Sequence, residues 1–400
     1  MRDTGRRKAY VLALGAVGLA GALTTAAFVA PNKAAAAVRP YTPASASDVV
    51  ATVPRRDPQE VAARQLLAKS PDRVELAVAL ARADISRARA LSDPRYLGRA
   101  QATLGRWWAM AEPPPDVLLL RATIEQSLHD FHAARIDLDH LISIRPGDAQ
   151  AQLTRAVVAT VTADYPAARA SCDAVASLAP ALVAEACKAP LDALGGHAAD
   201  AFNDLARAID SWRGDPSLAL WATTTLAELA IQRGDEPRAR MLLERVLAAD
   251  PTDAYTRAAL ADVLMQLHDP AASAKLCAGY EQIDNLLVRR AIAEHAARGP
   301  EADKLAQMMH DRIAAAAERG DRVHMREEAM FVLAVDGDAQ RALDLAKANW
   351  DVQKELADAR LLAEAATAAG DRAAAAPVVE WAATNGVIDA RLERFLGGLR

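Results

Sequence analysis

Between residues 115 and 180 the pattern of small and apolar positions occurs twice, at a spacing of 34 residues. Within each copy, apolar residues follow a small residue by four and by seven positions, which is the spacing of one face of an α-helix. A proline, which cannot continue a helix, closes each copy. The pattern predicts a repeated pair of antiparallel helices. The matched positions are Arg121-Ala122 with Arg155-Ala156, Ala134 with Ala168, Leu138 with Cys172, Leu141 with Val175 and Pro146 with Pro180.

A helix pair that repeats about every 34 residues resembles the tetratricopeptide (TPR) repeat. The resemblance implies an all-α fold, a right-handed TPR-like α-solenoid of roughly eight to nine antiparallel helix pairs. It also implies that the work of the chain is to hold a partner. Because each unit of a solenoid buries itself against its neighbours, 400 residues require no division into separate globular domains.

The solenoid is expected over residues 59–400, with its clearest repeats at 115–146, 147–180, 216–251 and 252–284. An insertion at 91–96 makes the first unit irregular, as terminal units of solenoids commonly are. Pro190 lies within the first helix of a looser unit and predicts a kink there. Farther along, Gly337-Asp338 and Gly370-Asp371 predict two more turns, because glycine adopts positive φ and aspartate caps the following helix.

Four basic residues, Arg2, Arg6, Arg7 and Lys8, precede an uncharged run from Ala9 to Ala30. As a helix this run would be about 33 Å long, enough to cross a bilayer core. We therefore predict a single N-terminal hydrophobic helix, a signal peptide or signal anchor over residues 1–30. Basic residues before the run indicate a cytoplasmic N-terminus and an exported body. The length favours an uncleaved inner-membrane anchor, while Ala35-Ala36-Ala37 leave cleavage open. Residues 31–58, rich in Pro, Ala and Ser, predict a semi-extended linker.

Two cysteines lie on either side of the repeat boundary at Pro180. Cys172 and Cys187 would lie on consecutive antiparallel helices at matching levels, as a disulfide requires. If the body is exported, its compartment favours a Cys172–Cys187 bridge, and two reduced buried thiols are the alternative. Cys277 stands at the repeat position of Leu243, which predicts a buried core thiol.

In TPR arrays the first helix of each unit lines an inner groove, so the resemblance also implies a set of groove residues. Trp221 and Tyr255 occupy the same repeat position, and so do Glu228 and Asp262. An aromatic row beside an acidic row suits an extended peptide with a basic or amide-rich segment. The alternative is that the aromatic residues pack between repeats and the acids are solvated. The implied partner-groove residues are Asp116, Thr123, Gln126, Gln150, Trp221, Glu228, Tyr255 and Asp262.

Charge and motifs argue against other functions. The 47 Lys and Arg against 52 Asp and Glu give a net charge of −5 without a basic run, so no nucleic-acid partner is expected. Gly-rich phosphate loops, nucleophile elbows and spaced cysteine sets are absent from the sequence, so we expect no enzyme and no cofactor. His324 and Glu327 resemble part of a zinc-protease helix, but Glu328 stands where the second histidine would be. His129 and His132 lack a carboxylate or cysteine cluster at ligand spacing, so no metal site is expected.

These observations predict a scaffold or adaptor on the periplasmic side of the envelope. It would bind protein or peptide partners in its concave groove during assembly, secretion or maturation of an envelope complex. One alternative is a purely structural, self-associating spacer of a membrane complex. Another is a metal-dependent hydrolase built on His324 and Glu327. The sequence does not identify the partner, the pathway or the oligomeric state.

Overall fold

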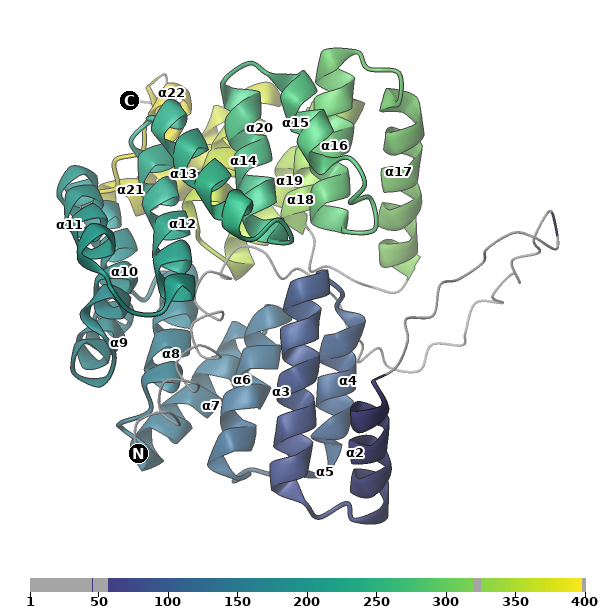
Figure 1. Ribbon diagram of the computed structural model, residues 1–400. Coiled ribbons are helices and arrows are strands. Elements are labelled where there is room, and N and C mark those ends of the chain that lie inside the picture. The colour runs from purple at the N-terminus through teal and green to yellow at the C-terminus, as the bar shows by residue number, and fades with distance from the viewer. Residues whose placement is uncertain (1–44, 46–56, 319–324, 398–400) are drawn as a thin grey trace.

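The computed structural model describes residue 45 and residues 57–318 and 325–397. Every regular element in those ranges is helical, which confirms the all-α prediction. The helices form antiparallel pairs that pack on one another in chain order (Figure 1), as in a TPR-type solenoid. The predicted hydrophobic helix within 1–30 and almost the whole linker lie outside the described residues. Within them, no helix combines the length and apolar character needed to cross a membrane.

The described ranges contain nine helix pairs, in agreement with the number expected from the repeat. Each pair consists of a first helix and a second helix. The first helix of a pair packs beside the first helices of the neighbouring pairs. The first helices are α3 (Val74–Leu91), α6 (Pro115–Ser127), α8 (Ala149–Val161), α10 (Ala181–Asp192), α12 (Pro216–Gln232), α14 (Ala254–Gln266), α16 (Asp284–Ala297), α18 (Met325–Phe331) and α20 (Leu356–Ala368). The second helices are α4 (Arg95–Thr103), α7 (Phe131–Ile144), α9 (Tyr165–Leu178), α11 (Ala198–Ser211), α13 (Glu236–Ala249), α15 (Pro270–Cys277), α17 (Ala302–Glu318), α19 (Ala339–Val352) and α21 (Ala376–Asn385).

Short elements complete the array. Helix α2 (Pro58–Lys69) packs on α3 at the N-terminal end, and α22 (Leu392–Leu396) packs on α20 at the other end. Helix α10 continues through Pro190 and runs directly into the π-helical segment, where the backbone departs from helical geometry at Gly196 and not at the proline. The remaining short helices are α5 (Gly105–Trp108), η2 (Ala193–His197), η3 (Val332–Asp336) and η4 (Arg372–Ala375).

The turn inside every helix pair contains one residue with a left-handed backbone. Its φ ranges from 46° at Ser92 to 90° at Gly196. Only glycine adopts this conformation without cost, and other L-residues lose about 1–2 kcal/mol there. The two turns predicted at Gly337 and Gly370 are confirmed. The nine residues are Ser92, His129, Ala163, Gly196, Gly234, His268, Arg298, Gly337 and Gly370.

An aspartate directly after the left-handed residue caps the helix that follows in six of these pairs, which is the second helix in five of them and η4, just before α21, in the sixth. Its carboxylate accepts a hydrogen bond of 3.0–3.2 Å from the backbone N–H three residues farther on. That N–H has no partner inside the helix, so the cap satisfies it and holds the turn. The capping residues are Asp130, Asp164, Asp235, Asp269, Asp338 and Asp371.

The repeated small and apolar positions form the core between the pairs. Ala134 and Ala168 are fully buried, and so are the apolar residues that follow them at four and seven positions. Alanine at these points lets the second helix lie close against the first, and the longer side chains then fill the space between units. The 34-residue pattern therefore records how the helices pack.

The predicted disulfide is present. Cys172 of α9 and Cys187 of α10 are bonded, with their Cα atoms 5.6 Å apart. Both cysteines are buried, so the bond ties two consecutive units together from within the core. Cys277 is a buried free thiol, as the repeat position indicated.

Loss of this disulfide should destabilise the solenoid. In a Cys172→Ser/Cys187→Ser variant, or in the reduced protein, the free energy of unfolding should fall by up to about 3 kcal/mol, because the bridge closes a short loop in the unfolded chain. Urea unfolding followed by circular dichroism measures the change. Reductant should have no further effect on the double variant. An unchanged urea midpoint in wild-type protein with verified free thiols would contradict this prediction.

Candidate functional site: an inner cavity closed by the C-terminal segment

The C-terminal end of the array returns to its middle (Figure 1). The backbone N–H of Lys354 donates to the carbonyl of Val161 at the end of α8, at 2.7 Å. The indole N–H of Trp381 donates to the hydroxyl of Tyr165 at the start of α9, also at 2.7 Å. Sequence reasoning identified neither contact, because these residues are far apart along the chain. The solenoid from α8 to α22 therefore forms a closed turn.

Residues 387–391, here called the closing segment, complete this turn against the end of α12. The side-chain amide of Gln232 donates to the carbonyls of Ala193 and Ile388, both at 2.9 Å. The backbone carbonyl of Gln232 accepts a hydrogen bond of 3.0 Å from the N–H of Ala390. Gln232 is only 3% exposed, so these bonds are shielded from water. One side chain thus joins three segments of the chain.

Ion pairs hold the closing segment on both sides. Asp389, which is almost fully buried, accepts hydrogen bonds from the guanidinium of Arg360 on α20. Arg391 lies 3.5 Å from the carboxylate of Glu236 at the start of α13. Removing one partner of such a buried pair leaves the other charge uncompensated, so both pairs resist opening.

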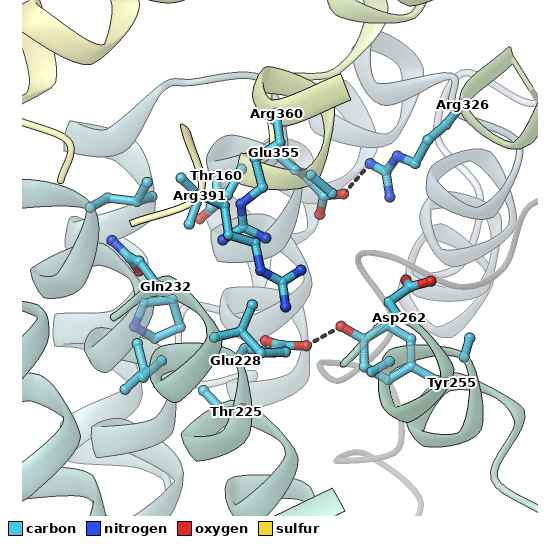
Figure 2. Close-up of a pocket in the computed structure, with 18 of the residues that line it drawn as sticks. Thr160, Thr225, Glu228, Gln232, Tyr255, Asp262, Arg326, Glu355, Arg360 and Arg391 are labelled. Carbon is cyan, nitrogen blue, oxygen red and sulfur yellow. Dashed lines mark hydrogen bonds and ion pairs between the residues drawn. The ribbon is translucent and has the colours of Figure 1, made fainter. Parts of the chain in front are cut away.

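A cavity of about 250 Å³ lies behind the closing segment. Seven consecutive first helices, from α8 to α20, contribute to its wall, so they face one common interior. Figure 2 shows Glu228, Tyr255 and Asp262 on one side of the cavity, with Glu355 and Arg360 on the other. Three of the residues predicted for the groove therefore meet in one place. The wall includes Thr160, Pro190, Glu228, Tyr255, Asp262, Arg289, Arg326, Lys354, Glu355, Arg360 and Arg391.

The acidic pair predicted from the repeat already has partners within the protein. The Tyr255 hydroxyl donates to the carboxylate of Glu228, and burial raises the pKa of Glu228 from 4.5 to about 7. Asp262 accepts two hydrogen bonds, of 2.9 and 2.8 Å, from the guanidinium of Arg289 on α16. Neither carboxylate stands free for a basic peptide.

A second group of buried charges lies at the start of α20. The guanidinium of Arg326 donates to Asp358 at 2.6 and 2.9 Å and also pairs with Glu355. Burial raises the pKa of Glu355 to about 7. Asp358 also accepts hydrogen bonds from the side chains of Asn349, at 2.6 Å, and Gln353, at 3.3 Å, and from the backbone N–H of Glu355, at 3.0 Å. Sequence reasoning missed these residues because they lie where the repeat pattern loosens.

The other predicted groove residues lie apart from the cavity wall. Trp221 is half-buried against the core around α10 and α12, and its ring does not contact the Tyr255 ring. On α6, Asp116 is exposed and pairs with Arg145 at 3.2 Å, while Thr123 is buried. Gln126 of α6 and Gln150 of α8 are half-buried. The set predicted from the repeat is therefore divided between two regions.

The structure does not bring His324 and Glu327 together as a metal site within the described residues. His324 lies outside the described residues, and Glu327 is buried within α18. In the described part of the chain, no three His, Cys, Asp or Glu side chains are placed to hold a metal ion.

No protein-family model and no curated protein matches the sequence. Solved structures resemble it in helix arrangement. PilW, titled a widely conserved type IV pilus biogenesis factor, has 16% sequence identity and a TM-score of 0.40, over 51% of this chain and 96% of that one. A tetratricopeptide repeat protein from Parabacteroides merdae has 15% identity and a TM-score of 0.37, over 77% and 99%. The TPR domain of P58(IPK) has 13% identity and a TM-score of 0.22, over 78% and 92%. Similarity at this level does not identify a partner or an activity.

Two glycine variants test the closure. An added Cβ at Gly234 would lie 2.8 Å from the Cβ of Ala390 in the closing segment, whereas at Gly337 it would meet nothing within 4 Å. Both residues have positive φ, so Gly234→Ala and Gly337→Ala should each lose about 1–2 kcal/mol of stability from the backbone alone. Only Gly234→Ala should also speed hydrogen exchange at residues 387–391. Equal exchange there in the two variants would show that the segment does not depend on this contact.

The pKa of Glu228 predicts a pH dependence of stability. A carboxyl whose pKa rises on folding binds its proton more tightly in the folded chain, so the free energy of unfolding falls between pH 4.5 and about 7 and is constant above. Glu228→Gln should remove this contribution and stabilise the protein by about 1–3 kcal/mol above neutral pH. Urea unfolding across the pH range measures it. Glu244→Gln, on the exposed side of α13, is the control, and equal pH profiles for the two variants would contradict the assignment.

Proposed function

We propose that the protein is a scaffold or adaptor on the periplasmic side of the envelope. It holds protein or peptide partners on the inner side of its superhelix while an envelope complex is assembled, secreted or matured. The supporting observation is that consecutive first helices turn toward one interior. A surface assembled from a row of helices presents side chains from many units to one extended partner.

The partner is best accommodated on α3, α6 and α8, here called the open arc. The helices that pack closely on α6 are α3, α4, α5, α7 and α8, its neighbours in the array. Asp116 is exposed there, and Gln126 is half-buried. The cavity, in contrast, has about 250 Å³ of space, which is too little for an extended peptide.

The mechanism is recognition without chemistry. The disulfide and the capped turns hold the helices in place before the partner arrives, so binding orders few protein groups. A preorganised surface loses less entropy on association, and more of the contact energy then appears as affinity. Asp116 and Gln126 offer carboxylate and amide groups to the polar groups of a bound segment.

The compartment is supported by the disulfide and by the N-terminal sequence. A buried disulfide between consecutive units is typical of proteins that fold in an oxidising environment. The basic residues before the apolar run at 9–30 orient the body toward the exported side. Both observations favour a periplasmic body attached to, or released from, the inner membrane.

Crosslinking in cells tests the partner site. A photo-crosslinking amino acid at Gln126 should give a discrete adduct with an envelope protein, and the same probe at Ile136 should not, because Ile136 is exposed on the second helix α7. A double Asp116→Lys/Gln126→Lys variant should lower recovery of that same adduct partner by about tenfold, as expected for loss of a central contact. Ile136→Lys is the matched control. Equal adduct yields at both positions would overturn the open arc as the docking surface.

A further inference from the structure

The wall of the cavity carries more cationic than acidic residues. Five of its wall residues are cationic and three are acidic. Two pairs lie within the wall, Arg289 with Asp262 and Arg326 with Glu355. The other cationic wall residues are Lys354, Arg360 and Arg391, and the one remaining acid is Glu228. Arg360 pairs with Asp389, and Arg391 lies 3.5 Å from Glu236, so Lys354 is the wall cation without an acidic partner in the described ranges.

Arg391 and Lys354 each have hydrogen-bond donors without a partner in the described chain. The Nη2 atom of Arg391 is buried and has no hydrogen-bond partner within the described chain. Nζ of Lys354 lies 6.0 Å from the centre of the Trp350 ring and has no carboxylate within ion-pair distance in the described ranges. A buried charged donor without a partner is costly, so a site that keeps one gains by accepting a complementary group.

Burial weakens the negative charge of the acids in the wall. Burial raises the pKa of Glu228 to about 7, so near neutral pH this carboxyl is partly protonated, and Tyr255 donates to it. Glu355 has its pKa raised in the same way. Burial, and next the charge of Arg360, lower the pKa of Arg391, while the charges of Asp262 and Glu236 act in the opposite direction. A bound anion would favour the charged form of Arg391 against its burial.

We propose that the cavity behind residues 387–391 binds a small dianion, such as a dicarboxylate or a phosphorylated metabolite, between Lys354 and Arg391. The available space, about 250 Å³, lies just below the usual range for ligand pockets and limits the occupant to a small molecule. The guanidinium of Arg391 suits carboxylate and phosphate oxygens, and Lys354 supplies a point charge.

This arrangement links ligand binding to the fold. Arg391 belongs to the closing segment, whereas Lys354 belongs to the connection between α19 and α20. An anion held by both residues draws the closing segment and this connection together. The ligand therefore stabilises the closed turn by mass action, because it binds the closed form and not the open one.

Binding of defined anions to the full-length protein tests the proposal. Isothermal titration with sulfate, inorganic phosphate, succinate and glycerol 3-phosphate distinguishes the inorganic, carboxylate and phosphate-ester sources. At least one probe should bind at a single site and raise the melting temperature. Because sulfate does not titrate near neutral pH, any sulfate binding should be tighter at about pH 6 than at about pH 8, where Glu228 and Glu355 regain charge.

Variants decide whether the binding is at this site. Lys354→Gln should weaken binding of the bound probe by about tenfold or more, since one of two charge contacts is lost. Arg391→Gln should do the same, and circular dichroism checks that each variant is folded. Arg240→Gln, which removes an exposed charge paired with Glu244 on α13, is the control and should bind as wild type. The proposal is overturned if no probe binds, or if folded Lys354→Gln binds like the control. Either result would leave the proposed scaffold function untouched, because that function is tested separately by crosslinking at Gln126.

Discussion

The hydrogen bonds of Gln232 are the contact on which the interior of this protein depends. A row of helix pairs has an open inner surface, and only a bond between its distant parts can close it. Gln232 supplies such a bond, with its backbone carbonyl on Ala390 and its amide on Ile388, and the contacts of Lys354 and Trp381 add to it. Glu228 and Glu355 lie in the interior formed in this way, and their burial there is the main cause of their raised pKa.

The charges inside the closed turn connect successive units. Arg289 reaches from α16 to Asp262 on α14, and Arg326 reaches from α18 to Asp358 beside it on α20. Pairs of this kind cost desolvation energy and are weak evidence for stability by themselves. Their geometry is more informative, because each guanidinium spans two neighbouring first helices. These ion pairs therefore favour one relative orientation of neighbouring units. Contacts between small apolar residues alone would permit several orientations.

The two regions of the inner surface suit different ligands. The closed turn has a small cavity with charged walls, whereas on the open arc Asp116 of α6 is exposed and Gln126 is half-buried. A scaffold with both would hold an extended partner on one region and keep the other rigid. The disulfide between α9 and α10 lies within the closed turn, next to α8, which belongs to both regions. Rigidity at that point would preserve the alignment of both surfaces.

The sequence by itself determined the local structure. Helix pairs, turns at Gly337 and Gly370, and the Cys172–Cys187 bond follow from interactions between residues close along the chain, and a repeated pattern records them directly. Repeat spacing also placed Glu228, Tyr255 and Asp262 on the inner side. Only the tertiary structure decided what faces them. Small rotations between units add up over the array, and their sum brings residues 354–391 onto α8 and α12. No local pattern encodes that sum, so the cavity and its cations could not be predicted from the sequence.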